Sequence, residues 1–457
     1  MTVVIVGGGI GGLRVANQLL QKYGTRAVVI DRSSRVGGRV RSEYDGDTLL
    51  YEGGPWRIPS THTRMIRLAR DLGLQLDPLP FSTPPHGTPD EVQGLSVWEA
   101  SLFRGKPPLA CDAADLASGY AGLSHCASGS SPYSADTDTY FTVKEGFQRG
   151  IIDALARGLD VRLNTRVVDV LRLPSGKYRI ACRKRRDRIF ESVTIDCDEL
   201  FLCVPPSATL DWTIVRQWAL AQVHAVSYEP LQHIYAKSKT PLPFAFHVIR
   251  PSTALAQIIS PIYAWSEWFH ASYSGGRVAH FWHRLRMINP LRFVEYLKSE
   301  LWRYLSIDID DDVRVHHTEI AYHTWKSAPN FSLNKAVATA VMPHPTRLPH
   351  VYWVGEAFSS FQGWMEGALE TADLAVNLSK EGCSYILPTR LATRNEVVVD
   401  DRIVSIDAFM QGHPGGEAPL RNHMGEDVSE LFRHIGHSHT AWSVVFNLQD
   451  GMLAESA

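Results

Sequence analysis

Residues 3–12 read VVIVGGGIGG, and this stretch decides the N-terminal fold. The four apolar residues Val3–Val6 have the pattern of a strand that is buried on both faces of a parallel sheet. The glycines that follow directly satisfy the spacing GxGxxG at Gly7, Gly9 and Gly12. An amphipathic helical pattern comes next, so the stretch predicts a strand, a tight glycine turn and a helix.

This arrangement predicts a dinucleotide-binding Rossmann unit. Gly7 permits the tight turn, Gly9 lets the backbone approach a pyrophosphate, and Gly12 lets the helix pack closely on the strand. The helix N-terminus offers its free N–H groups to the phosphates. A second apolar run over 27–30 ends at Asp31, which is placed to accept a hydrogen bond from a ribose hydroxyl. The pattern to this point is compatible with either FAD or NAD.

Further segments distinguish between FAD and NAD as the cofactor. Residues 35–40 (RVGGRV), 52–57 (EGGPWR) and 351–375 (VYWVGEAFSSFQGWMEGALETADLA) resemble the flavin-containing amine oxidase superfamily, whose second glycine pair and arginine close over the FAD pyrophosphate. Residues 142–154 and 200–206 extend this resemblance, as does 161–171, which it implies to be the strand whose Val167 contacts the adenine. The resemblance therefore implies FAD. The FAD-binding residues that it implies are Gly7, Gly9, Gly11, Gly12, Asp31, Arg32, Gly38, Arg39, Gly54, Pro55, Trp56, Val167, Gly355, Glu356, Trp364 and Met365.

The resemblance also implies a substrate subdomain, discontinuous in sequence, built from about 57–140 and 207–325. Trp364 stands where monoamine oxidases place one wall of an aromatic cage, which attracts an amine to its π face. Phe331 is a candidate for the opposing wall. For both side chains, packing in a core is the alternative interpretation.

Two further candidates bear on catalysis. Arg57 resembles the arginine with which L-amino acid oxidases bind the substrate carboxylate through two hydrogen bonds. Its alternative is a surface or FAD-contacting arginine. His233, or its neighbour Gln232, stands where the family usually has a lysine that holds a water near the flavin. Lys237 shares a strand face with His233 if alternation is regular, and is a possible substitute.

The segment from residue 384 to 457 has a different character. It contains the sequence HPGG at 413–416 and, 24 positions after the first histidine, His437 within Gly-His-Ser. These features resemble cytochrome b5, which binds haem b through two histidines, here His413 and His437. Two axial ligands fill both open positions of the iron, so such a haem transfers electrons. His439 is a competing candidate for the second ligand.

Composition restricts the partners and the location that we expect for this protein. The 457 residues carry a net charge of −2, which gives no argument for nucleic acid as a partner, and no apolar stretch approaches the length of a membrane span. The basic run at 183–186 is expected to be a solvated hairpin tip. The six cysteines show no CxxC spacing, which favours a reducing, cytoplasmic location. The oligomeric state stays open.

Together these patterns predict an α/β protein. A Rossmann-type FAD-binding domain with a discontinuous, mixed-sheet α+β substrate domain is expected over 1–380, and a small α+β cytochrome b5-like domain over 384–457. The leading function is FAD-dependent oxidation of an amine or L-amino acid to an imine, with electrons passed to the haem. Three alternatives are an oxidase that reduces O2 to H2O2, a desaturase acting on C–C bonds, and a non-enzymatic haem or redox sensor.

Overall fold

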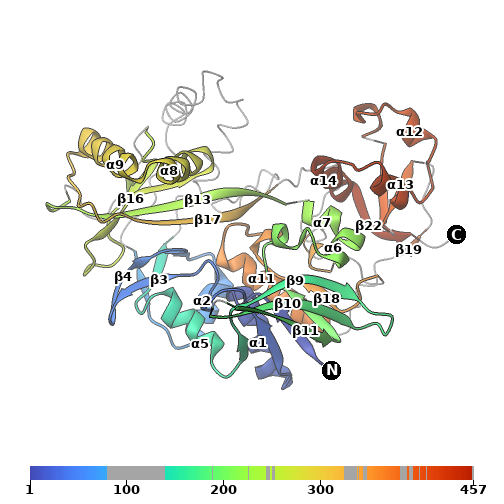
Figure 1. Ribbon diagram of the computed structural model, residues 1–457, viewed down its shortest axis with the longest axis horizontal. Helices are drawn as coiled ribbons and strands as arrows, with labels where there is room; N and C mark the ends of the chain where they lie inside the picture. Colours follow the sequence, from blue (N-terminus) through green and yellow to red (C-terminus); the bar gives the residue numbers. More distant parts are fainter. Residues whose placement is uncertain are drawn as a thin grey trace.

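The computed structural model describes residues 1–79, 139–187, 189–224, 226–242, 248–249, 253–323, 337, 339–342, 347–380, 389–390, 395–400, 402–407 and 409–454. A parallel sheet with its helices forms the base of the molecule in Figure 1. A long antiparallel sheet lies above this base, with two helices on its outer face. The C-terminal segment packs at one side of the base (Figure 1).

The base is a five-stranded parallel sheet in the order β18-β12-β1-β2-β8. Strand β1 (Val3–Val6) is buried at all four residues, because the helix that follows the glycine turn packs against it and because it shares an apolar core with the antiparallel sheet of residues 165–197. Helix α1 (Ile10–Tyr23) follows the glycine turn and packs against α11 (Met365–Lys380). The expected strand, turn and helix are therefore present. The other strands are β2 (Ala27–Ile30), β8 (Asp160–Arg162), β12 (Glu199–Leu202) and β18 (Val351–Trp353).

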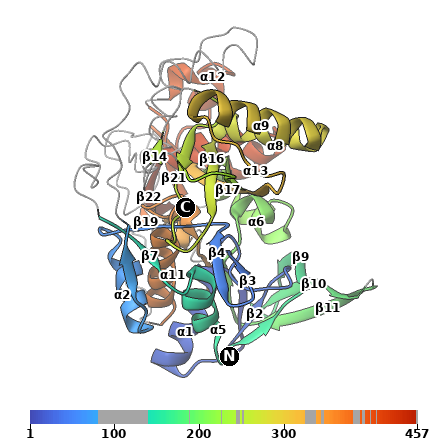
Figure 2. The same cartoon turned by 90° about the vertical axis from the view of Figure 1, so that its left-hand side faces the viewer.

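A three-stranded antiparallel sheet lies beside this base. It contains β9 (Thr165–Arg172), β10 (Tyr178–Arg186) and β11 (Ile189–Cys197) in the order β11-β10-β9. The β10–β11 hairpin extends away from the rest of the molecule in Figure 2, so the basic run lies near an exposed hairpin tip, as expected. Residues 161–171 were expected to form one strand. They are divided between β8 and β9, because Asn164 adopts a left-handed conformation with φ of 52° between them.

Short elements connect the two large sheets. The hairpin of β3 (Ser42–Asp45) and β4 (Thr48–Glu52) leads into the EGGPWR loop. Helix α2 (Thr63–Asp71) is anchored to the start of α11, because the Glu366 carboxylate accepts the Met65 N–H at 2.9 Å. The remaining elements are β5 (Ile58–Pro59), β6 (Leu76–Pro78), β7 (Tyr140–Val143), the π-helix η1 (Gln148–Ile152) and α5 (Asp153–Ala156).

The upper sheet has the order β14-β15-β16-β13-β17. Its longest strand, β13 (Val226–Lys237), lies between β16 (Trp268–Gly275) and the edge strand β17 (Arg314–His323) and pairs with both. Helices α8 (Gly276–Ile288) and α9 (Pro290–Leu305) share an apolar core with the sheet's outer face. The remaining elements are β14 (Val248–Ile249), β15 (Gln257–Ile259), η2 (Pro206–Thr209), α6 (Thr213–Trp218) and α7 (Leu220–His224).

The C-terminal segment forms a four-stranded sheet in the order β19-β22-β21-β20, with short helices on it. The hairpin formed by residues 396–405 turns at Asp400, where φ is 54°. Trp442 of this segment belongs to the same buried apolar core as Val223 of α7, so the segment is packed against the base rather than tethered to it. Its elements are β19 (Thr389–Arg390), β20 (Glu396–Val399), β21 (Arg402–Ser405), η4 (Met410–Gly412), α12 (Ala418–Arg421), α13 (Ser429–His434), α14 (His439–Leu448) and β22 (Gln449–Ala454).

Candidate functional site

The glycine turn after β1 opens onto a cavity of about 760 Å³. Gly7 has a φ of 109°, a conformation that side chains with a Cβ rarely adopt. A Cβ on Gly12 would lie 2.0 Å from the Gly7 carbonyl oxygen, so only glycine allows α1 to begin this close to the turn. A Cβ on Gly9 would meet no atom within 4 Å, because Gly9 faces the cavity. The open space in front of the α1 N-terminus therefore suits a phosphate.

Two further backbone segments complete this end of the cavity. The Asp31 carboxylate accepts the N–H groups of Gly8 and Ser33, each at 2.7 Å, and this holds the ends of β1 and β2 together. Each carboxylate oxygen keeps a second lone pair, with which it can accept a ribose hydroxyl. The N–H of Gly37 donates to the Gly8 carbonyl at 2.8 Å, which brings the second glycine pair over the first turn.

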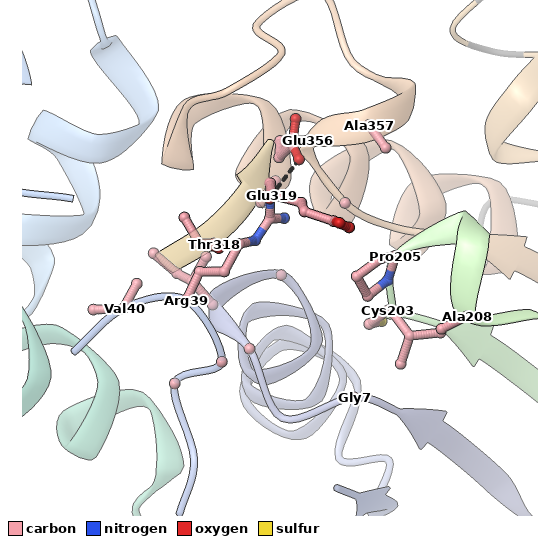
Figure 3. Close-up of a pocket in the computed structure, with 18 of the residues that line it drawn as sticks. Gly7, Arg39, Val40, Cys203, Pro205, Ala208, Thr318, Glu319, Glu356 and Ala357 are labelled. Atoms are coloured by element: carbon pink, nitrogen blue, oxygen red, sulfur yellow. Dashed lines mark hydrogen bonds and ion pairs between the residues drawn. The ribbon is translucent and has the colours of Figure 1, made fainter. Parts of the chain in front are cut away.

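An ion pair crosses the cavity from two segments far apart in sequence. The Arg39 guanidinium donates to the Glu356 carboxylate at 2.5 Å, as the dashed line in Figure 3 shows. The second Glu356 oxygen accepts the Gly363 N–H at 2.8 Å, and Arg39 also donates to the Glu319 carbonyl at 3.2 Å. Glu356 is buried, so a charged partner offsets the cost of keeping its carboxylate away from water. This ion pair joins the second glycine pair to the η3 turn (Glu356–Phe358).

The cavity collects nearly all the cofactor residues that the sequence predicted. Gly12 is the exception, because it lies behind the turn, where it allows the close packing of α1. The predicted residues that line the cavity are Gly7, Gly9, Gly11, Asp31, Arg32, Gly38, Arg39, Gly54, Pro55, Trp56, Arg57, Val167, His233, Gly355, Glu356, Trp364 and Met365.

Arg57 lies in an aromatic environment at the cavity wall. Its guanidinium carbon is 4.6 Å from the ring centroids of both Trp56 and Tyr140, and 5.7 Å from that of Trp364. Within the described part of the chain, no carboxylate lies within ion-pair distance of Arg57. The aromatic faces stabilise the positive charge. The N–H groups of Arg57 are therefore suited to an anionic group that enters the cavity.

Buried polar groups surround His233 on the upper sheet. Its Nδ1 lies 3.1 Å from His270 Nε2, which is 2.6 Å from the Tyr235 hydroxyl. Burial, with a further contribution from His316, lowers the pKa of His233 to about 3, so its imidazole is neutral at physiological pH. Lys237 lies two residues after Tyr235 on the same strand. Its Nζ binds Glu267 at 3.1 Å, and it does not line the cavity.

A buried carboxyl group supports the loop that carries Gly54 and Trp56. Glu52 accepts hydrogen bonds from the Ser42 and Tyr263 hydroxyls at 2.7 and 2.8 Å, and from the Phe147 N–H at 3.1 Å. Burial raises the pKa of this carboxyl to about 7, despite these three hydrogen bonds. The loop therefore begins on a titratable group that binds a proton more readily than an exposed glutamate.

His413 and His437 lie in two loops of the C-terminal segment, after η4 and before α14. The Nδ1 of His413 lies 2.7 Å from the Gly416 carbonyl oxygen, and that of His437 lies 2.9 Å from the Phe432 carbonyl oxygen. A carbonyl only accepts, so each Nδ1 carries the proton and each Nε2 keeps the lone pair that binds a metal. The Phe432 ring stacks on the His437 ring, with 3.9 Å between the two ring centroids. The donor set fits the two axial positions of a haem.

Apolar side chains near these histidines are exposed to an unusual degree. Leu431 and Ile435 have 41% and 59% of their surface exposed, although both lie within seven residues of His437. A planar apolar group bound next to them would cover this surface. Helix α14 begins at His439, two residues after His437.

Of the predicted site residues, Phe331 belongs to a segment outside the described residues. Other residues line the cavity although the sequence did not predict them. Tyr273 of β16, Thr318 of β17 and Asp211 line the cavity and carried no readable motif. Regular alternation along β13 could have placed Tyr235 on the face of His233. His270 lies on another strand, and only the pairing of β13 with β16 brings it there.

The comparison with protein families agrees with this geometry. Residues 10–95 and 109–378 match the model of the family described as flavin containing amine oxidoreductase, and the chain belongs to this family. Residues 394–454 match the model described as cytochrome b5-like heme/steroid binding domain. The first family implies FAD and the second implies haem, so the protein is an FAD-dependent oxidoreductase with a haem-binding segment.

Similar proteins support the same class. The chain is 40% identical to an L-amino-acid oxidase of Siganus canaliculatus over 94 residues, which are 20% of this chain and 17% of that protein. It is 37% identical to the flavin-containing amine oxidase A of Sus scrofa over 73 residues, which are 16% and 14% of the two chains. These matches therefore span less than a fifth of either relative.

A solved structure has a similar fold over a much longer range. Wild-type putrescine oxidase bound to putrescine aligns with a TM-score of 0.57 at 16% identity, over 83% of this chain and 98% of that one. At this identity the likeness concerns the fold alone. None of the helices in the described ranges is long and apolar enough to cross a membrane.

Proposed function

We propose that this protein oxidises the C–N bond of an L-amino acid, or of an amine that bears a carboxylate, to an imine. The observation that supports this substrate class is Arg57, whose guanidinium lies at the cavity wall between the rings of Trp56 and Tyr140. A cationic amine without a carboxylate would meet the positive charge of Arg57 near the aromatic faces. A carboxylate would form charge-assisted hydrogen bonds with it. Trp364, and Phe331 as its proposed counterpart, would enclose the substrate side chain.

The chain's own residues would hold and orient the cofactor. The α1 N-terminus at Gly9 would receive the pyrophosphate, and Asp31 would accept the adenosine ribose. The Arg39–Glu356 pair would close over the phosphate and ribityl region, and Val167 would contact the adenine. Bound FAD supplies the acceptor for the hydride equivalent, and the cavity walls exclude water and orient the substrate. The neighbouring residues Arg32, Gly38, Gly54, Pro55, Gly355 and Met365 would complete the binding surface.

We propose further that electrons leave one at a time through the haem held by His413 and His437, which would pass them to an electron-transfer partner outside this chain. The packing of the two parts of the chain supports this path. Phe432, stacked on His437, lies 4.7 Å from Trp442, and Trp442 belongs to the core shared with α7. A packed contact between the two parts fixes the haem-ligand loops relative to the cofactor cavity, so that electrons would pass within one chain. The boundary between the parts, which is proposed near residue 384, and a cytoplasmic location belong to the same proposal.

An anaerobic stopped-flow experiment tests this function. The holoprotein is mixed with single L-amino acids and with the corresponding decarboxylated amines, while flavin and haem absorbance are followed separately. Flavin bleaching by an amino acid, followed by haem reduction at a rate that does not depend on protein concentration, is the expected result. A haem that stays ferric while the flavin is reduced would favour O2 as the acceptor, with H2O2 as the product. A flavin that no amine or amino acid bleaches would refute the proposed reaction and leave C–C desaturation or redox sensing.

A further inference from the structure

Three strands bring a buried hydrogen-bonded chain to the cavity wall. The Tyr235 hydroxyl lies 2.6 Å from the Glu52 carbonyl oxygen and 2.6 Å from His270 Nε2. His270 Nε2 in turn lies 3.1 Å from His233 Nδ1. Tyr235 and His270 are fully buried or nearly so, and His233 lines the cofactor cavity. This hydrogen-bond chain therefore runs from the backbone of Glu52, at the start of the EGGPWR loop, to the cavity.

The positions of the protons in this chain follow from donor and acceptor chemistry. A carbonyl oxygen only accepts, so the single hydroxyl proton of Tyr235 is donated to Glu52. The second short contact of Tyr235 must then be an acceptance, and His270 Nε2 must carry a proton. His270 Nε2 donates this proton to the Tyr235 hydroxyl and to His233 Nδ1. A proton on His233 Nδ1 would point at the His270 proton and repel it, so His233 carries its proton on Nε2.

The charge state of the histidines agrees with this assignment. Burial is the largest cause that lowers the pKa of His233 to about 3 and that of His270 well below its usual range. The titratable and charged groups that face them are His316 from β17, Tyr273 from β16 and Arg57 from the loop. His316 and Arg57 both disfavour an additional positive charge. No carboxylate side chain of the described residues forms an ion pair with either histidine.

We propose that Tyr235 and His270 are positioning residues that hold His233 as a neutral Nε2–H donor directed at the cofactor cavity. The assignment deepens the proposed function, on which it partly rests. It gives His233 the position near the flavin that a lysine usually occupies in the family. A lysine presents a positive charge and up to three rotating donors, whereas a neutral imidazole presents one donor in a fixed plane. His233 would therefore position a water or a ring atom of the flavin without adding charge to the cavity.

The tautomer can be measured directly. The FAD-loaded protein, labelled with ¹⁵N-histidine, is studied by NMR between about pH 5 and 8, and the His233 signals are assigned with His233→Gln. A single neutral Nε2–H tautomer that does not titrate over this range is the expected result. A His233 that carries its proton on Nδ1, or that becomes protonated within the range, overturns the proposal.

Variants separate positioning from general packing. Tyr235→Phe removes the group that requires a proton on His270 Nε2. His270 can then carry its proton on Nδ1 and accept one from His233 Nδ1, so His233 is expected to populate both neutral forms. His317→Gln is the matched control, because His317 lies on the opposite face of β17 and binds Gln232 at 3.2 Å. It should leave the His233 signals unchanged. An unchanged tautomer in Tyr235→Phe overturns the role of Tyr235, and if that variant fails to fold, the spectrum of the unmodified protein still decides the tautomer.

A second readout concerns the flavin itself. His233→Phe removes the donor and should shift the flavin midpoint potential to a lower value, whereas His233→Gln keeps an N–H donor and should largely restore it. Equal potentials in the two variants would show that the donor does not reach the flavin or its bound water. These results do not depend on the substrate, so a failure of the proposed amino acid oxidation leaves them interpretable.

Discussion

The glycine turn offers a test in which three substitutions within five residues have different consequences. A Cβ added at Gly12 would lie 2.0 Å from the Gly7 carbonyl oxygen, about 1.5 Å inside the ~3.5 Å separation of atoms in good contact. The obstacle is backbone, so α1 must move away from the turn. Overpacking of this kind costs about 3 kcal/mol. We therefore expect Gly12→Ala to lower the melting temperature of the apoprotein by roughly 3 °C.

Gly9→Ala should act on the cofactor and leave the fold intact. Its Cβ would meet no protein atom within 4 Å, and Gly9 has a φ of −75°, which alanine adopts without strain. The new methyl group would, however, occupy the cavity in front of the α1 N-terminus. The loss of one or two N–H contacts to a charged phosphate, at about 1.5 to 3 kcal/mol each, corresponds to roughly a hundredfold weaker FAD binding.

Gly8→Ala is the matched control for both variants. The nearest atoms to its Cβ would be those of Asp31 at 3.4 Å and Val36 at 3.5 Å, and Gly8 does not line the cavity. Stability and flavin content should both stay close to those of the unmodified protein. The assays are thermal unfolding of each apoprotein and calorimetric titration with FAD. Unchanged FAD affinity in Gly9→Ala, or unchanged stability in Gly12→Ala, would refute the assignment of the cavity or of the helix packing.

Three further predictions concern other parts of the site. Arg57→Met should lower kcat/KM for an L-amino acid by about a hundredfold, with little change for the decarboxylated amine, and equal losses for both substrates would contradict carboxylate binding. His413→Ala and His437→Ala should each abolish the haem absorption band while the flavin content is retained, and a haem that survives in both would exclude the pair as axial ligands. The pKa of Glu52 is about 7 in the folded state and 4.5 in its ordinary environment, so the folded state binds the proton more tightly than the unfolded state. The contribution of Glu52 to folding stability therefore falls as the pH rises from about 4.5 to 7, by about 3 kcal/mol in total. Glu52→Gln should remove this slope in denaturant unfolding measured across that range, whereas an unchanged slope would show that Glu52 is not its source.

Local sequence predicted the parts of the site that are built from consecutive residues. The turn after β1 has this property, because Gly7, Gly9 and Gly12 are required by backbone geometry within ten residues. The two haem-ligand candidates were also readable, since each sits in a short loop motif. The division of 161–171 into two strands was missed, because asparagine is one of several residues that tolerate the left-handed conformation found at Asn164.

Contacts between distant segments could not be predicted in this way. The Arg39–Glu356 pair joins residues 317 positions apart, and the His233–His270 contact depends on the pairing of β13 with β16. The packing of the C-terminal segment on α6 and α7 has no local signal either, because Trp442 and Val223 are ordinary apolar residues until the fold brings them into one core.

The sequence by itself determined the class of protein: glycines and apolar runs specify where a backbone turns and which strands are buried, and these requirements are local. Only the tertiary structure decided the chemistry of the cavity wall. It placed aromatic rings around Arg57, buried Glu52 so that its pKa rises, and surrounded His233 with partners that exclude a positive charge. The physical reason is that pKa, tautomer and charge depend on burial and on neighbours across the fold, which no single stretch of sequence contains.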